Sequence, residues 1–204
     1  IAAAEPALEC LRAGKPARLV EVPRELGAAF RRLQLLTAKP LLYVANVDEA
    51  SAAAGNDLSR QVEAMARENS AECVTISAAI EAEIAQLRDA DERTAFLDEL
   101  DLKEPGLKRV IEAGYRLLDL VTFLTTGPKE TRAWTIPRGT RAPQAAAVIH
   151  SDFERGFIRA ETIAYDDFIK CGGETKARDA GKMRSEGKEY VVKDGDVVLF
   201  RFNV

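Results

Sequence analysis

The sequence predicts an α/β fold with parallel strands, followed by a smaller α+β unit. Residues 41–45 and 72–76 are continuous apolar runs of strand-forming residues, and a helical pattern lies between them. Continuous apolar strands that are joined through a helix are typical of a buried, right-handed parallel βαβ arrangement. Near residue 120 the pattern changes, because a hairpin and short strands replace the helices.

The stretch before the first strand, residues 1–38, is predicted to be helical. A short helix is expected over 6–12, and Pro23 can open the next helix as its first residue. From there the apolar residues keep helical spacing as far as Leu36, and Pro40 ends the pattern.

Helices are also expected around the second strand. The last of them starts at residues 104–106 and presents one apolar face. The expected helices cover 58–69, 81–88, 92–100 and a segment from 104 onward whose apolar face consists of Leu107, Val110, Ile111, Tyr115 and Leu118.

The last 85 residues or so have the pattern of one small β-grasp-like domain. A turn at Gly127-Pro128 joins the first two strands into a hairpin, and a turn at 193–196 precedes the last strand. We expect strands at 121–126, 131–136, 157–163, 190–192 and 197–202, and short helices at 143–148, 165–170 and 176–183.

The composition is that of a globular protein, with 47% hydrophobic and 30% charged residues among 204. No apolar run approaches the roughly 20 residues of a membrane span, so no membrane partner is expected. The three cysteines are far apart and form neither a disulfide framework nor a metal knuckle, which favours a reduced, cytoplasmic protein without a metal site. A start at Ile1 without Met suggests part of a longer protein.

Charge is distributed unevenly along the chain. Residues 1–119 hold 15 basic and 21 acidic groups, whereas residues 120–204 hold 14 basic and 12 acidic groups. The C-terminal part is therefore the better candidate for an anionic partner, although its excess of positive charge is small.

Each apolar strand of the first part ends in small and polar residues. Asn46-Val47-Asp48-Glu49 follows the first strand, and Ser77-Ala78 follows the second. Ligand loops of parallel sheets lie at these carboxyl ends, so the pair resembles the base-reading half of a nucleotide site. The phosphate-reading motif G-x-x-x-x-G-K-[ST] is absent from the sequence. We therefore assign no catalytic residue within this chain.

The residues resemble one family closely, the YchF-type P-loop NTPases, which are related to translation factors and end in a TGS domain. The most specific stretch is Thr126-Gly-Pro-Lys-Glu-Thr-Arg-Ala-Trp134. Further matching stretches are 35–46, 76–83, 123–125, 142–150, 157–161 and 194–204.

The resemblance implies a domain order. Residues 1–38 would be the end of a helical coiled-coil insertion, 39–119 the C-terminal half of the nucleotide-binding domain, and 120–204 the TGS domain. It also implies ATP or GTP as the ligand and Mg²⁺ as its companion. The phosphate loop and the Mg²⁺ ligands would then lie before Ile1.

The resemblance gives Asn46, Val47 and Glu49 a role in reading the base. Relatives among the GTPases carry N-K-x-D here, whereas this chain lacks the Lys and has the longer Glu, so guanine discrimination should weaken. The Asn46 amide can accept a hydrogen bond from the adenine 6-amino group and donate one to N7. Val47 would form an apolar wall, and Ser77 and Ala78 would close over the base edge. Two alternatives remain: Asn46 merely caps the next segment, or Asp48 faces the ligand in place of Glu49.

The C-terminal part carries basic residues around one aromatic residue. Such a set suits an RNA backbone with an occasional stacked base, and TGS domains resemble ribosome-associated modules, so ribosomal RNA is the expected partner and DNA is not. Trp134 could equally be part of the core. The candidate RNA-binding residues are Lys129, Arg132, Trp134, Arg138 and Arg141. His150, the only histidine, is expected to have a structural role near a helix end.

Two function classes follow. In the first, the chain would be part of a ribosome-associated ATPase that uses GTP less specifically and acts as a translation-linked switch. The chain by itself would then be inactive. Alternatively, it is a non-enzymatic RNA- or ribosome-binding TGS module with a residual base-recognition loop. A stand-alone TGS regulatory protein is a third and poorer reading.

Overall fold

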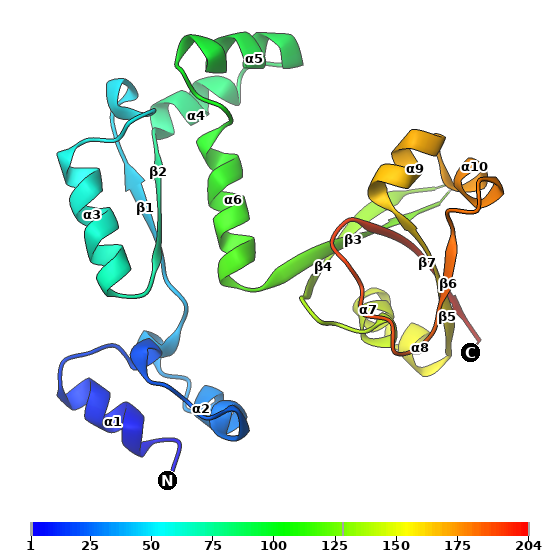
Figure 1. Cartoon of the computed structure of the whole chain (residues 1–204), viewed down its shortest axis with the longest axis horizontal. Coiled ribbons are helices and arrows are strands. Elements are labelled where there is room, and N and C mark those ends of the chain that lie inside the picture. Colours follow the sequence, from blue (N-terminus) through cyan, green and yellow to red (C-terminus); the bar gives the residue numbers. More distant parts are fainter. Residues whose placement is uncertain (1, 128, 204) are drawn as a thin grey trace. The chain divides into compact units, whose positions relative to one another are not determined.

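The computed structural model describes residues 2–127 and 129–203. The chain divides into two compact units, residues 1–117 and 118–204. The turn expected at Gly127-Pro128 lies partly outside the described residues, because Pro128 is not among them. The elements are coloured along the sequence in Figure 1.

The first unit begins with short helices. The expected helix from Pro23 to Leu36 is wrong in its length, because α2 ends at Arg32 and Gln34 adopts a left-handed backbone conformation with φ of 51°. The elements before the first strand are α1 (Glu5–Arg12), η1 (Ala17–Leu19), η2 (Arg24–Leu26), α2 (Gly27–Arg32) and η3 (Leu36–Ala38).

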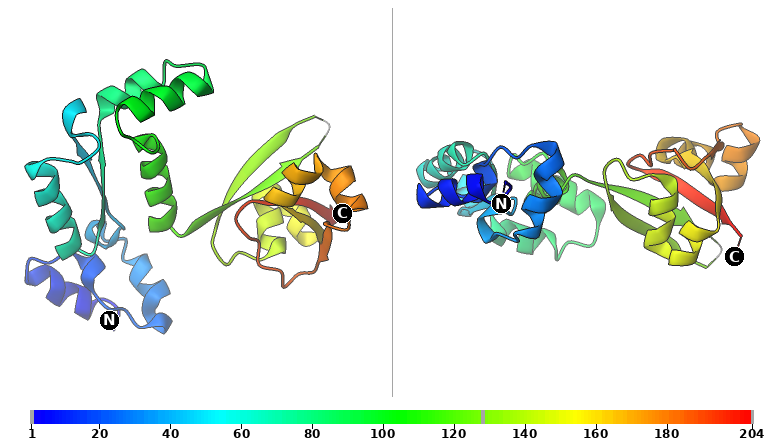
Figure 2. Two further views of the ribbon diagram at one scale, coloured as in Figure 1. Left: turned by 45° about the horizontal axis from the view of Figure 1, so that its top comes forward. Right: turned by 90° about the horizontal axis from the view of Figure 1, so that it is seen from below.

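A parallel pair of strands forms the centre of the first unit. β1 (Leu42–Asn46) pairs with β2 (Glu72–Ile76) in parallel, and Val44 lies opposite Val74. α3 and α6 both pack against these strands (Figures 1 and 2). The remaining elements of this unit are η4 (Glu49–Ser51), α3 (Asp57–Glu68), α4 (Ala78–Ile84), α5 (Ala90–Glu99) and α6 (Gly106–Leu117).

The helix between the strands begins with a reciprocal cap. The Asn56 side chain accepts a hydrogen bond from the Ser59 amide, and the Ser59 hydroxyl accepts one from the Asn56 amide, both at 2.9 Å. Such a capping box satisfies backbone donors that a helix start leaves without partners. It fixes where the loop after β1 ends and α3 begins.

One burial expectation for the first unit is wrong. β1 is not a fully buried strand, because Val44 is 45% exposed. Within the described residues β1 pairs only with β2, so its other edge carries no neighbouring strand. The apolar face that the spacing predicted for α6 is only partly covered, since Leu107, Ile111 and Leu118 are exposed whereas Ala113 is buried.

The second unit is built on a five-stranded sheet with the order β4-β3-β7-β5-β6. β3 and β4 form the expected antiparallel hairpin, β3 and β7 are parallel, and β5 pairs antiparallel with β7 and β6. The strands are β3 (Leu120–Thr126), β4 (Thr131–Pro137), β5 (Phe157–Ala164), β6 (Arg184–Glu186) and β7 (Asp196–Phe202). The helices are α7 (Ala142–Ile149), α8 (Ser151–Arg155), α9 (Tyr165–Cys171) and α10 (Glu174–Asp179).

One core holds this unit together. Phe123 is fully buried and meets Phe200 edge to face, with ring centroids 5.8 Å apart. Ala145 and Ala146 bring α7 close to the sheet, because small side chains permit a short approach. Both views in Figure 2 have α7 and α8 side by side against the sheet.

The structure corrects three element predictions in the second unit. Residues 190–192 are not a strand, since Val191 makes only one isolated bridge, with Arg141. The strand in this region is β6, which the sequence reading missed along with α8. α10 ends at Asp179, four residues before the predicted end.

Candidate functional site

The two loops singled out from the sequence meet at one edge of the first unit. β1 and β2 are parallel, so the loops that follow them leave from the same side of the sheet. Asn46 Oδ1 accepts a hydrogen bond from the Ala78 amide at 2.9 Å, and the Val47 amide donates to the Ile76 carbonyl at 2.8 Å. Two segments more than 30 residues apart in sequence are thereby joined.

The contact gives Asn46 a capping role, but for α4 rather than for the segment that directly follows it, which was the alternative considered from the sequence. Ala78 is the first residue of α4, and its amide has no partner within that helix, so Asn46 caps α4 from a neighbouring strand. The Asn46 side chain must point its oxygen, and not its NH2 group, at Ala78, because the Ala78 backbone N–H can only donate. Its Nδ2 group has no partner among the described residues, and the side chain is exposed.

Asp48 and Glu49 differ in what their carboxylates contact. Asp48 Oδ1 accepts a hydrogen bond from the Ser51 amide at 2.9 Å and so caps η4. Glu49 is exposed, and its carboxylate makes no hydrogen bond or ion pair within the described part of the chain, although its backbone carbonyl accepts a hydrogen bond from the Ala52 amide. Of the two carboxylates, Glu49 is therefore the one with both oxygens available to a ligand.

Ser77 directly precedes Ala78 in the chain and is buried. Its side chain is 3% exposed, and its Oγ has no hydrogen-bond partner among the described residues. Most buried hydroxyls in proteins are hydrogen-bonded, so an unsatisfied one beside an exposed loop is unusual. Val47 is half-buried and Ala78 is exposed, so the edge combines a free amide donor, a free carboxylate and a small apolar surface.

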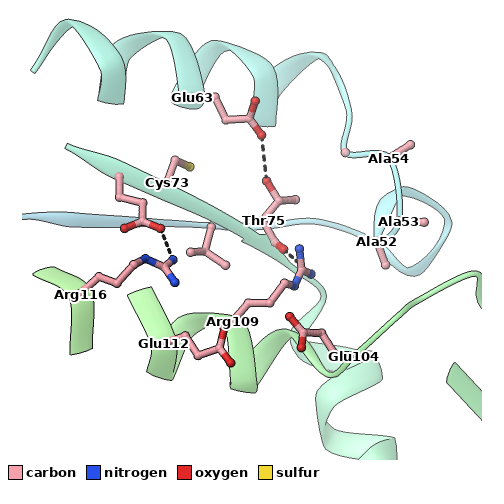
Figure 3. Close-up of a pocket in the computed structure, with 13 residues that line it drawn as sticks. Ala52, Ala53, Ala54, Glu63, Cys73, Thr75, Glu104, Arg109, Glu112 and Arg116 are labelled. Atoms are coloured by element: carbon pink, nitrogen blue, oxygen red, sulfur yellow. Dashed lines mark hydrogen bonds and ion pairs between the residues drawn. The ribbon is translucent and has the colours of Figure 1, made fainter. Parts of the chain in front are cut away.

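A separate, charged pocket of about 420 Å³ lies between α3, β2 and α6 (Figure 3). Arg109 donates to the Thr75 carbonyl at 2.9 Å, Arg116 pairs with Glu72 at 2.5 Å, and the Thr75 hydroxyl donates to Glu63. None of the predicted base-binding residues lines this pocket.

The thiol in the charged pocket does not resemble a nucleophile. Burial raises the pKa of Cys73, and Glu63 raises it further, which disfavours the thiolate. Within residues 2–127 and 129–203, no group of three or more His, Cys, Asp or Glu side chains could hold a metal ion. The described helices include none that is long and apolar enough to cross a bilayer.

The basic residues of the second unit have different surroundings. Arg138 pairs with Asp119 at 3.0 Å and Arg141 with Glu189 at 2.8 Å, and all four side chains are largely exposed. Lys129 is exposed and forms no ion pair with any described residue. The sequence had not indicated these acidic partners, because they are distant from the basic residues along the chain.

Trp134 packs against the core, so it is not the exposed aromatic on which the RNA prediction relied. Its Nε1 donates to Thr125 Oγ1 at 2.9 Å, and its ring lies stacked beside Phe123. The Arg132 guanidinium lies over the indole, 4.3 Å from its centroid. Arg132 thus occupies a position at which a base would stack.

His150 has the structural role that was expected of it. Its Nδ1 accepts a hydrogen bond from the Asp152 amide at 3.2 Å, which caps the start of α8. Asp152 in turn pairs with Arg155, and that hydrogen bond holds the pKa of the Asp152 carboxyl below its usual value.

Comparison with known proteins relates the chain to one family. A protein-family model named YchF-GTPase_C, described as a protein of unknown function (DUF933), matches residues 120–203. Over 198 residues the chain is 50% identical to the "Ribosome-binding ATPase YchF" of Bacillus subtilis (strain 168), which covers 96% of this chain and 54% of that protein. Residues 120–203 belong to the YchF C-terminal family, and the chain as a whole is similar to YchF proteins.

Further relatives agree with this assignment. The YchF protein of Escherichia coli O157:H7 is 54% identical over 187 residues, which are 92% of this chain and 51% of that protein. The YchF GTPase structure from Schizosaccharomyces pombe superposes with a TM-score of 0.84 at 32% identity, covering 98% of this chain and 53% of that one. The family resemblance inferred from the sequence is confirmed, and so is the α/β fold class.

A more distant structure supports the fold alone. A GTP-binding protein from Pyrococcus horikoshii OT3 superposes with a TM-score of 0.57 at 18% identity, over 98% of this chain. The chain spans about half the length of the curated relatives that it matches.

Proposed function

We propose that this chain supplies the base-recognition loops of a ribosome-associated YchF-family protein that binds and hydrolyses ATP, and GTP less specifically, as a translation-linked switch. The observation that carries the proposal is the hydrogen bond between Asn46 Oδ1 and the Ala78 amide. It joins the ends of two parallel strands into one edge, where nucleotide-binding folds hold their ligands. The relatives that are named ribosome-binding ATPases support the same activity and partner.

The donors and acceptors at this edge suit adenine. Asn46 Nδ2 would donate to N7, and the second lone pair of its Oδ1 would accept from the 6-amino group. Val47 would contact the base face, and the buried Ser77 hydroxyl would find its missing partner on the base or on an ordered water. Glu49 would accept from a donor on the base edge, which allows guanine as a poorer alternative.

The phosphates and Mg²⁺ would be held by residues outside this chain, since its sequence contains no G-x-x-x-x-G-K-[ST] motif. In this proposal residues 1–38 end a helical insertion, 39–119 complete the nucleotide-binding domain, and 120–204 form the TGS domain. Association with ribosomes would make the protein cytoplasmic.

Nucleotide selectivity tests the base-reading assignment. In the complete protein, the double variant Val47→Lys with Glu49→Asp restores the N-K-x-D pattern and should shift preference from ATP toward GTP. Calorimetric titration with both nucleotides measures the ratio of the two dissociation constants. An unchanged ratio would place base recognition elsewhere in the protein.

The second unit is a candidate for contact with ribosomal RNA, and the arrangement of its basic residues favours this. Exposed ion pairs such as Arg138–Asp119 and Arg141–Glu189 contribute only about 0–1 kcal/mol, so a phosphate can replace the carboxylate at little cost. Lys129 and Arg132 would add charge on the β3–β4 hairpin. Trp134 would act indirectly, by supporting the Arg132 guanidinium.

Co-sedimentation with ribosomes tests the RNA contact. Arg132→Ala should weaken binding and reduce its salt dependence, because one phosphate contact is lost. Lys170→Ala is the matched control, since it removes an exposed positive charge on α9 of the same unit. Equal effects of the two variants would indicate nonspecific attraction and argue against the hairpin.

A further inference from the structure

Glu81 connects the candidate base-recognition loop to a helix that follows much later in the chain. It lies in the first turns of α4, three residues after Ala78. Its Oε1 accepts a hydrogen bond from the Gly106 amide at 2.6 Å, and its Oε2 accepts one from the Leu107 amide at 3.0 Å. A single carboxylate thus holds two of the amides that begin α6.

The contact has the character of a strong cap. Amides at a helix start have no partners within the helix, and the helix dipole favours a negative charge there. Hydrogen bonds to an ionised acceptor are also stronger than those between neutral groups. Because Glu81 comes from α4, this cap ties two helices together rather than stabilising only one.

Close packing reinforces the connection. Gly106 is buried, and a Cβ at that position would stand 2.8 Å from Ile76 Cγ2 and 2.9 Å from Glu81 Oε1. The backbone of α6 therefore approaches the last residue of β2 more closely than any other residue type would permit. Ile76 immediately precedes Ser77, so the start of α6 also limits where the loop can move.

The loop Ser77-Ala78 is consequently held on both sides. Asn46 holds the Ala78 amide from β1, and Glu81 fixes the following turn of α4 to α6. Ile80 and Ile84 anchor the opposite face of α4 in a small core with Leu97. Without Glu81, the first turn of α4 would keep its apolar anchor but lose its attachment to α6.

We infer that Glu81 is a positioning residue for base recognition: its carboxylate sets the position of Ser77 and Ala78 relative to Asn46. The inference rests on the proposed function of these loops. Glu81 itself does not contact the nucleotide in this arrangement, since both of its oxygens face α6.

A ligand without a base separates this role from a general effect on folding. In the complete protein, Glu81→Ala should weaken ATP binding roughly tenfold, a factor that corresponds to the net worth of about one hydrogen bond. Binding of tripolyphosphate should be unchanged, because that ligand uses only the phosphate site. Glu81→Gln, which keeps the shape and one acceptor, should have a smaller effect on ATP and none on tripolyphosphate.

Glu83→Gln is the matched control, since Glu83 is exposed on the same helix and its side chain has no partner among the described residues. If Glu81→Ala and Glu81→Gln both keep the wild-type preference for ATP over tripolyphosphate, or weaken both ligands equally, the positioning role is refuted. If the wild type itself binds ATP no better than tripolyphosphate, the proposed base recognition fails first, and the role of Glu81 fails with it.

Discussion

Asn46 combines two roles that substitution can separate. Its Oδ1 holds the Ala78 amide, and its Nδ2 is free for a ligand. Asn46→Asp keeps an acceptor for Ala78 but replaces the free donor by a second acceptor, which would face the N7 acceptor of adenine. Asn46→Ala removes both the acceptor and the donor.

The expected magnitudes follow from the two contacts. Loss of the base contact costs about 1–3 kcal/mol, or roughly 5- to 150-fold in the Kd for ATP, so Asn46→Asp should fall in this range. Asn46→Ala should bind ATP more weakly still. Loss of the hydrogen bond to Ala78 leaves the loop less ordered, which adds about 1 kcal/mol to the cost of binding.

Two assays distinguish the variants. Calorimetric titration of the complete protein with ATP measures the base contact, and amide hydrogen exchange at Ala78 measures the loop contact without any nucleotide. Exchange at Ala78 should be faster in Asn46→Ala and unchanged in Asn46→Asp. If Asn46→Asp binds ATP as tightly as the wild type, Asn46 does not contact the base.

Two further predictions concern the stability of the second unit. Phe123→Ala should lower the free energy of unfolding by about 3–5 kcal/mol, because Phe123 is fully buried against Phe200; urea unfolding measures this, and a loss below about 1 kcal/mol would contradict the proposed core. Hydrogen bonds from Arg201 and then Arg159 hold the pKa of Glu161 below its usual value. A depressed pKa in the folded state means that Glu161 stabilises the fold above its unfolded pKa of about 4.3 and that this contribution disappears as the pH falls through the folded pKa. The stability difference between the wild type and Glu161→Gln should therefore shrink in acid, and a pH-independent difference in urea unfolding would refute the assignment.

Local patterns predicted most of the secondary structure. The apolar runs at 41–45 and 72–76 became the parallel pair β1–β2, and the runs at 121–126 and 131–136 became the β3–β4 hairpin. In each case the side-chain pattern and the turn residues favour the same local structure, so little depends on distant parts of the chain.

The errors occurred where a distant segment decides the outcome. β6 has only three residues, and it is a strand because β5 offers an edge with which to pair. The apolar face of α6 was read correctly from its spacing, yet burial depends on what lies against that face, and there Leu107 and Ile111 are exposed. Trp134 could have been a surface or a core residue until Phe123 and Thr125 were placed beside it.

The sequence by itself determined the fold class, the family and the two loops that form the candidate site. Each loop is recognised from neighbouring residues alone, because its polar residues directly follow an apolar strand in the sequence. Only the tertiary structure decided how those loops are held. The bonds from Asn46 to Ala78 and from Glu81 to Gly106 join residues 32 and 25 positions apart. No local pattern encodes such pairs, since their distances are set by the parallel register of β1 and β2 and by the close approach that Gly106 permits.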